Sequence, residues 1–170
     1  QPNRPPEVEI LSPEENADGT APRFYADQNI QLKATVADPE DPDGSDVRLT
    51  WESSIDGVLD LDIALEIKES LAIVEAQAET TLSQGEHTLT LKAIDQGDAQ
   101  GSDQVSVNVI GPNEAPDCAI NLPGEGTVFN EDEVIAFSGT SSDGNDVGDF
   151  SVLSVQWQSD RNGVFNIDSP

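Results

Sequence analysis

The sequence predicts an all-β protein built from antiparallel β-sandwiches in tandem, and three observations lead to this prediction. Apolar and polar residues alternate over short segments such as Ile30 to Ala34, which is the period-two pattern of half-buried strands. Stretches rich in Gly, Pro, Asp and Ser separate these segments and are typical of turns. Blocks of similar sequence also recur in the same order about 105 to 110 residues apart, as tandem repeats do.

The repeat is visible in three pairs of segments and in a turn that follows the last of them. The pairs are Asn3–Ile10 with Asn113–Ile120, Asp27–Asp38 with Asp132–Asp143, and Val47–Trp51 with Leu153–Trp157. Each tryptophan then precedes a glycine at the same spacing. We therefore predict a complete sandwich over residues 1–111 and the N-terminal half of a second, truncated repeat over residues 112–170. Origin from a longer tandem array explains the truncation, and strand donation between molecules is the alternative.

Each strand of the two repeats is predicted by its inward-facing apolar positions. In the first repeat these are Val8 and Ile10; Ile30, Leu32, Ala34 and Val36; Val47, Leu49 and Trp51; Leu89, Leu91 and Ala93; and Val105, Val107 and Val109. In the second repeat they are Cys118, Ile120 and Leu122; Ile135 and Phe137; and Leu153, Val155 and Trp157. Residues 59–78 alternate at Leu61, Ile63, Leu65 and Ile67, which favours two strands, although their Ala, Leu and Glu content also suits a short helix. Seven strands in about 105 residues fit an antiparallel sandwich with Greek-key connections.

The charge balance excludes several classes of partner. The chain has 34 acidic and 7 basic residues and a formal net charge of −27. Nucleic acids and anionic membrane surfaces would repel it, so neither is an expected partner. The sequence has no apolar run of about 18 residues, so we expect no direct membrane insertion. The charge can keep exposed sheet edges soluble, or it can bind a divalent cation such as Ca²⁺, and the two interpretations are compatible.

Nothing in the sequence indicates catalysis. His87 is the single histidine and is interpreted as a surface or edge residue at a strand entry. Cys118 alternates with Ile120 and Leu122, so it should face the core as a small hydrophobe, with a disulfide to a later part of the repeat as the alternative. No glycine-rich phosphate loop and no Cys/His cluster is present. We predict a protein that is not an enzyme and has no organic cofactor.

Two groups of oxygen-bearing side chains are candidate Ca²⁺ sites. In a sandwich of this topology, the loops after the second and sixth strands lie at the same end. This would bring together Asp38, Glu40, Asp41, Asp43, Asp95 and Asp98. A second group, at the junction of the repeats, comprises Asn113, Glu114, Asp143, Asn145 and Asp146. Converging carboxylates repel one another unless a cation bridges them, and solvated acidic loops are the alternative.

Three segments carry a resemblance to a known superfamily. They are the "PP-x-V-x-I" start, the segment "DPEDPDGSDVRLTWESSIDGVL", and "LSQGEHTLTLKAIDQGDAQGSDQVSVNV". Together they resemble bacterial immunoglobulin-like repeats of the PKD and cadherin-like type. The resemblance implies an immunoglobulin-like antiparallel sandwich with Trp51 and Trp157 as core residues of the third strand and Asp95 at the end of the sixth. The sequence departs from the PKD pattern after Trp51, and its junction, Gly111 to Pro116, lacks the full cadherin calcium motif.

The resemblance and the repeats together predict an extracellular or cell-surface module of a bacterial stalk or fibre. Its role would be structural or adhesive, with neighbouring repeats of the same or a longer chain as partners and calcium as a stiffening ion. A cell-surface protein or glycan is a further expected partner. The alternative is a carbohydrate- or protein-binding accessory module of a secreted hydrolase. That role needs clustered exposed aromatics, and Phe24, Tyr25 and Phe129 are the candidates.

Overall fold

The computed structural model describes residues 2–40, 46–68, 73–144 and 153–166. The chain forms two compact units, Gln1–Pro112 (unit 1) and Asn113–Pro170 (unit 2). The described residues form strands and turns but no helix, so none of them forms a helix able to cross a membrane. Candidate residues Asp41, Asp43, Asn145 and Asp146 lie outside the described ranges.

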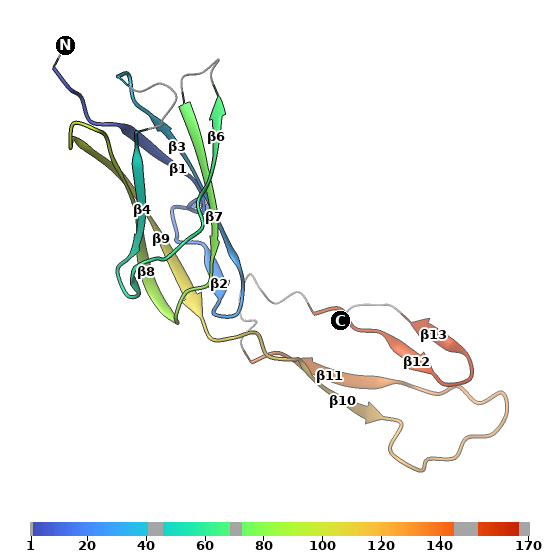
Figure 1. Cartoon of the computed structure of the whole chain (residues 1–170). Coiled ribbons are helices and arrows are strands. Elements are labelled where there is room, and N and C mark those ends of the chain that lie inside the picture. The colour runs from blue at the N-terminus through green and yellow to red at the C-terminus, as the bar shows by residue number, and fades with distance from the viewer. Residues whose placement is uncertain (1, 41–45, 69–72, 145–152, 167–170) are drawn as a thin grey trace. The chain divides into compact units, whose positions relative to one another are not determined.

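Unit 1 is an immunoglobulin-like β-sandwich of two sheets (Figure 1). One sheet has the order β1-β3-β7-β6 and consists of Glu7–Ser12, Ile30–Ala37, Ile73–Thr80 and Ala64–Lys68. The other has the order β2-β9-β8-β4-β5 and consists of Arg23–Tyr25, Gln100–Ile110, Gly85–Ile94, Arg48–Ser53 and Gly57–Val58. All pairings are antiparallel except the parallel pairing of β2 with β9. This is the strand order of immunoglobulin domains, which confirms the predicted fold class.

The core of unit 1 lies between the sheets and follows the period-two pattern. Along β3 and β8 the side chains alternate between buried and less buried positions, because successive residues of a strand point to opposite faces. Trp51 of β4 is 1% exposed and belongs to this core cluster. Its fully or nearly fully buried neighbours in the cluster include Ile30, Leu32, Ala34, Leu89, Leu91, Val105, Val107 and Val109.

Two short strands, β2 and β5, could not be placed by alternation, whereas β6 and β7 could. β6 lies within residues 59–78 and β7 begins there, as the alternation favoured, and none of the described residues among 59–78 is helical. β2 and β5 have three and two residues, which is too short for a period to show in the sequence. β5 pairs with β4 across the turn at Gly57, whose φ of 75° is open to glycine and costly for most other residues.

Unit 2 contains two hairpins that reproduce hairpins of unit 1. β10 (Asp117–Leu122) pairs with β11 (Ser138–Ser142), and β12 (Trp157–Ser159) pairs with β13 (Gly163–Asn166). The β10–β11 ladder has the register of β1–β3, including a shift at Ile120 where β1 has one at Ile10. The β12–β13 turn pairs Ser159 with Gly163, as the β4–β5 turn pairs Ser53 with Gly57.

Cys118 does not face a core, contrary to the sequence-based expectation. It is a free and exposed cysteine, and all six residues of β10 are exposed. Within the described part of unit 2, β11 is the only strand that pairs with β10, and the side chains of β10 remain exposed. The alternation was therefore read correctly as a strand pattern, but burial also requires a covering layer.

Candidate functional site

The described acidic candidates of unit 1, Asp38, Glu40, Asp95 and Asp98, follow strand ends on the side of the sandwich that carries the N-terminus (Figure 1). Asp38 directly follows β3, and Asp95 directly follows β8. β1 pairs with the end of β3, and the side chain of Asn3 reaches Asp95, so the N-terminal segment connects the two sheets here. The topology thus brings the ends of β3 and β8 to one end of unit 1.

Asp95 is buried, at 3% exposure, and both of its oxygens have partners. Oδ2 accepts a hydrogen bond from Asn3 Nδ2 at 2.9 Å, and Oδ1 accepts one from the Ala99 amide at 2.9 Å. The second bond closes the turn between β8 and β9, in which Asp98 has a φ of 62°. Asp95 therefore already has a structural role, which is to hold both the turn and the N-terminal segment.

Asp38 is also buried, at 4% exposure, but only one of its oxygens is satisfied. Oδ1 accepts a hydrogen bond from the Glu40 amide at 2.8 Å. Oδ2 is shielded from solvent and finds no hydrogen-bond partner among the described residues. Burying a carboxylate oxygen without a partner is costly, so this atom is a place where a cation or a donor would be stabilising.

The two remaining described acidic candidates of unit 1, Glu40 and Asp98, lie near basic side chains. Glu40 Oε1 lies 3.8 Å from Arg4 Nε, and Asp98 Oδ1 lies 3.2 Å from Arg48 Nη2. Arg48 and Asp98 are both largely exposed, so their pairing contributes little to stability. Over the described ranges, no three His, Cys, Asp or Glu side chains are grouped so that they could hold a metal ion.

In unit 2 the described candidates Asn113, Glu114 and Asp143 are close in sequence to the open end of the β10–β11 hairpin. Asp117 pairs with Ser142, so Glu114 and Asp143 flank the same end of this ladder. Glu114 Oε2 lies 3.7 Å from the position that a Cβ atom on Gly144 would take. Asp143 is partly buried and Asn113 is exposed, and both engage in interactions with their surroundings. Asp143 occupies the place in this hairpin that Asp38 occupies in unit 1.

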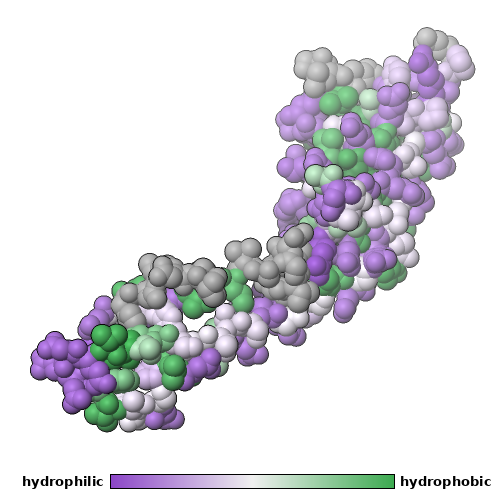
Figure 2. All heavy atoms as spheres, turned by 180° about the vertical axis from the view of Figure 1, so that it is seen from behind, coloured by the Kyte–Doolittle hydropathy of each residue, from purple (hydrophilic) through white to green (hydrophobic). Residues whose placement is uncertain are grey.

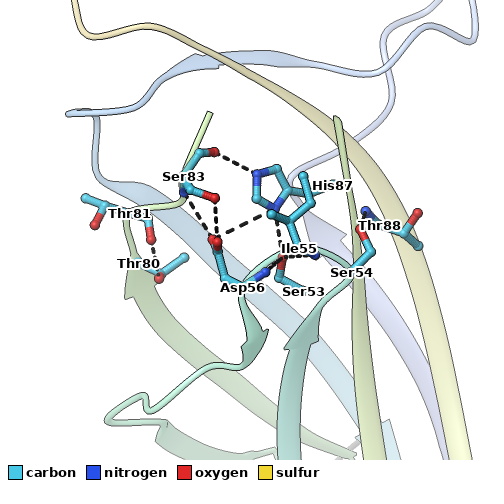
Figure 3. A network of polar contacts seen from close by, with 9 residues as sticks. All are labelled: Ser53, Ser54, Ile55, Asp56, Thr80, Thr81, Ser83, His87 and Thr88. Carbon is cyan, nitrogen blue, oxygen red and sulfur yellow. Dashed lines mark hydrogen bonds and ion pairs between the residues drawn. The ribbon is translucent and has the colours of Figure 1, made fainter. Parts of the chain in front are cut away.

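A buried polar network around His87 was not anticipated from the sequence (Figure 3). The His87 residue is 1% exposed, and its imidazole lies between the turn after β4 and the segment before β8. Nδ1 lies 2.7 Å from the hydroxyl of Ser53, and Nε2 lies 2.7 Å from the carbonyl oxygen of Ser83. Ser53 Oγ also accepts the amides of Ile55 and Asp56 at 3.2 and 3.1 Å.

The hydrogen-bonding partners in this network determine which groups donate and which accept. The Ser83 carbonyl can only accept, so Nε2–H donates to it. Ser53 Oγ already accepts two amide hydrogens, so its own proton goes to Nδ1. Asp56 completes the network by accepting hydrogen bonds from the hydroxyl and the amide of Ser83, the latter at 3.0 Å. The Ser83 hydroxyl is the main reason why the pKa of Asp56 lies below its ordinary value; burial opposes this, and the Ser83 amide adds to it.

The network has the residue types of a hydrolytic triad but not its geometry. In such a triad the serine contacts one imidazole nitrogen and the aspartate contacts the other. Here Ser53 contacts Nδ1, and Asp56 Oδ2 lies 3.9 Å from the same nitrogen. The backbone carbonyl of Ser83 contacts Nε2. Ser53 is 4% exposed and accepts two backbone amides, so the group is a structural clamp on the turn.

The interpretation of His87 as a surface or edge residue was therefore wrong. His87 is in phase with Leu89, Leu91 and Ala93 along β8, and all four are buried. The period-two pattern thus contained the signal. It was missed because a polar residue at an inward position is buried only when partners satisfy it, and those partners come from distant segments of the chain.

The aromatic candidates for a ligand-binding face are dispersed. Phe24 is partly buried and packs against the core of unit 1. Tyr25 is its neighbour on β2, and successive residues of a strand point to opposite faces. Phe129 belongs to unit 2. Phe24 and Tyr25 therefore do not present one aromatic surface within unit 1.

No protein-family model and no curated protein matches the chain. Among solved structures it is similar to the fibronectin(III)-like modules of CbhA from Clostridium thermocellum, with 20% identity and a TM-score of 0.43 over 81% of this chain and 63% of that one. It is also similar to a chimeric titin Z1Z2, with 10% identity and a TM-score of 0.40 over 65% and 99% of the two chains. The major pilin subunit BcpA of Bacillus cereus is 14% identical, with a TM-score of 0.32 over 84% and 54%. Likenesses this distant add nothing to the fold described above.

Proposed function

We propose that the chain is a structural or adhesive module of an extracellular or surface-bound bacterial stalk or fibre, built from tandem immunoglobulin-like repeats of the PKD or cadherin-like type. The observation that carries the proposal is the repetition of the β1–β3 register, including its irregularity, in β10–β11 of the next unit. Tandem units that each fold largely on their own add length to a protein, and neighbouring repeats are then its first partners.

The side-chain chemistry of unit 1 supports a role without catalysis. The side chains of Ser53, His87 and Asp56 hold the turn after β4, and Ser53 and His87 are both buried. The net charge of −27 favours a solvated module that does not associate through its sheet edges. A surface protein or a glycan remains the expected adhesion target, and its identity is open to direct binding measurements.

The spacer role is tested by the length of tandem arrays. Chains with one, two and three copies of residues 3–110 placed before unit 2 should increase in maximum dimension by a constant increment in small-angle X-ray scattering. Their unfolding midpoint should stay close to that of the single copy, because each repeat contributes its own core. Growth that stops after the second copy, or repeats that collapse onto one another, would contradict the spacer role.

We also propose that Ca²⁺ stiffens the module at the N-terminal end of unit 1, and Asp38 is the specific observation in favour. Its Oδ2 is buried without a partner among the described residues, and calcium prefers carboxylate and carbonyl oxygens. Asp38 would be a central ligand. Asp95 lies at the same end of unit 1, and Asp41 and Asp43 follow Asp38 in the sequence. The second candidate group, around Asn113 and Asp143, has less support, since both residues already have interactions.

Thermal unfolding with excess Ca²⁺ and with a chelator tests the cation. Binding at 100-fold over the dissociation constant stabilises the folded state by about 2.7 kcal/mol, so the midpoint should rise by several degrees beyond a NaCl control of equal ionic strength. Asp38→Asn should abolish this rise, and Asp62→Asn, which removes the same charge from an exposed position, should retain it. An equal rise of the unfolding midpoint in NaCl would show that Ca²⁺ does not bind specifically, and the acidic loops would then serve solubility.

A further inference from the structure

The N-terminal segment of unit 1 contacts residues that follow both β3 and β8, where the calcium site is proposed. Asn3 Nδ2 donates to Asp95 Oδ2 at 2.9 Å, directly after β8. The next residue, Arg4, places its Nε 3.8 Å from Glu40 Oε1, after β3. One short segment therefore contacts the ends of two strands, and its arginine brings a positive charge close to Asp38.

Glu40 connects Arg4 to Asp38. The amide of Glu40 donates to Asp38 Oδ1 at 2.8 Å, and its carboxylate is the partner of Arg4. The guanidinium and the Asp38 carboxylate are therefore separated by no more than the length of one glutamate and these two contacts. Such a span is comparable with the Debye length, which is about 10 Å at 0.1 M salt, so the guanidinium would repel a cation bound at Asp38.

The atom that points to a ligand here is Asp38 Oδ2, which is buried and has no hydrogen-bond partner among the described residues. Ca²⁺ takes six to eight oxygen ligands, so further oxygens would have to come from nearby residues. The carboxylate of Glu40 is the next described acidic group along the chain. Its side chain is 28% exposed and that of Arg4 is 59% exposed, so the arginine can turn into solvent while the glutamate stays in place.

The position of Arg4 carries the opposite charge in unit 2. The pairing of Asn3–Ile10 with Asn113–Ile120 places Glu114 where unit 1 has Arg4. Glu114 Oε2 lies 3.7 Å from the position that a Cβ atom on Gly144 would take, so this side chain also reaches the residues that follow the second strand of its hairpin. Basic residues are scarce, at 7 against 34 acidic ones, and hydrophilic residues cover most of the visible face of unit 1 (Figure 2). An arginine at this position is therefore a specific feature of unit 1.

We propose that Arg4 is a built-in competitor of the cation: its guanidinium and Ca²⁺ compete for the carboxylate of Glu40, and this competition sets the calcium affinity of the Asp38 site. The inference rests on the calcium site proposed above and adds its regulation. Without calcium, Arg4 neutralises Glu40 beside the buried Asp38 carboxylate. Calcium binding displaces the arginine, and the N-terminal segment then loses one of the two side-chain contacts described above.

Calorimetric titration of the full chain with Ca²⁺ in 0.1 M NaCl tests the competition. Arg4→Gln should tighten calcium binding about 3-fold or more, because a unit charge close to a divalent ion is removed. Arg4→Glu, which introduces the residue of unit 2, should tighten it further. The control Lys33→Gln removes the same charge from an exposed position about 16 Å before Asp38 along β3, where screening should hold the change below about 2-fold. Arg4 is largely exposed, so its replacement leaves the fold of unit 1 intact.

Two further variants assign the effect to this site. Glu40→Gln removes the shared ligand, so it should weaken calcium binding, and Arg4→Gln should then have a smaller effect than in the wild type, as expected for coupled residues. Asp38→Asn should abolish the calcium binding that responds to Arg4, which separates it from any cation held by unit 2.

The outcomes distinguish this inference from the calcium site itself. Calcium binding that Arg4→Gln leaves unchanged or weakens overturns the competition and leaves the site standing. An equal gain in Lys33→Gln, or an undiminished effect of Arg4→Gln after Glu40 or Asp38 is replaced, also overturns the competition. The absence of calcium binding in both the wild type and Arg4→Glu overturns the competition and the proposed site together.

Discussion

Ser53 joins the turn after β4 to the buried imidazole of His87, so its replacement by alanine should destabilise unit 1. The hydroxyl accepts the amides of Ile55 and Asp56 and donates to His87 Nδ1 at 2.7 Å. The His87 side chain is 0% exposed, so water cannot replace the lost donor. The turn amides lie nearer the surface, where water can take over part of their hydrogen bonding.

The size of the effect follows from these contacts. A buried acceptor left without a partner costs about 1–3 kcal/mol, and an ordinary hydrogen bond contributes about 0.5–1.5 kcal/mol. One full penalty at Nδ1 and a partial loss at the two amides add up to about 2–4 kcal/mol for Ser53→Ala. His87→Leu together with Ser53→Ala removes both partners, so the double variant should cost less than the sum of the single ones.

Hydrogen exchange of β8 amides over a urea series in the full chain measures the stability of unit 1 without interference from unit 2. Ser159→Ala is the matched control, because its hydroxyl accepts the amides of Arg161 and Asn162 in the equivalent turn of unit 2, at 3.2 and 3.4 Å. It should leave the unfolding free energy of unit 1 unchanged. A cost of less than about 0.5 kcal/mol for Ser53→Ala, which is within the range of ordinary surface substitutions, would refute the reasoning.

Three further predictions concern unit 1. The lowered pKa of Asp56 stabilises the fold above the ordinary value of 3.8, and this contribution is lost as the pH falls through the folded pKa; Asp56→Asn should therefore flatten the acid limb of a stability profile measured below pH 5. Gly101→Ala would place a Cβ atom against the carbonyl oxygen of Pro6. The free energy of unfolding should therefore fall by about 1–3 kcal/mol, and amide hydrogen exchange along β1 should become faster. Leu91→Ala empties a fully buried position and should lower the unfolding free energy by about 2–5 kcal/mol in urea titrations.

Each of these has a matched control. Asp62→Asn removes an exposed carboxylate and should keep the wild-type acid limb; a flattened limb in this variant too would assign the effect to general charge. Gly111→Ala meets nothing within 4 Å and should be tolerated, so equal damage at both glycines would argue against the close approach of Pro6. Val58 is 66% exposed, and Val58→Ala should cost little; a loss equal to that of Leu91→Ala would contradict the placement of the core.

The strands with strong alternation could be predicted because their period directly reports a half-buried strand. β3, β4, β8 and β9 follow this pattern, and their inward residues form the core that the sequence indicated. The repeat was also readable, because the same local sequence forms the same hairpin in both units, as the shared register of β1–β3 and β10–β11 shows. The short strand β2 left no such trace, since its place depends on pairing with the distant β9.

The sequence by itself therefore determined the fold class, the repeated hairpins and the end of the sandwich at which Asp38 and Asp95 lie, because these follow from local periodicity and strand order. Only the tertiary structure decided that His87 is buried and clamped, that Asp38 Oδ2 is left without a partner among the described residues, and that Cys118 is exposed. Burial and hydrogen-bond satisfaction depend on which distant segments cover a residue. Alternation predicts the face of the strand on which a side chain lies, but not whether another part of the protein packs against that face.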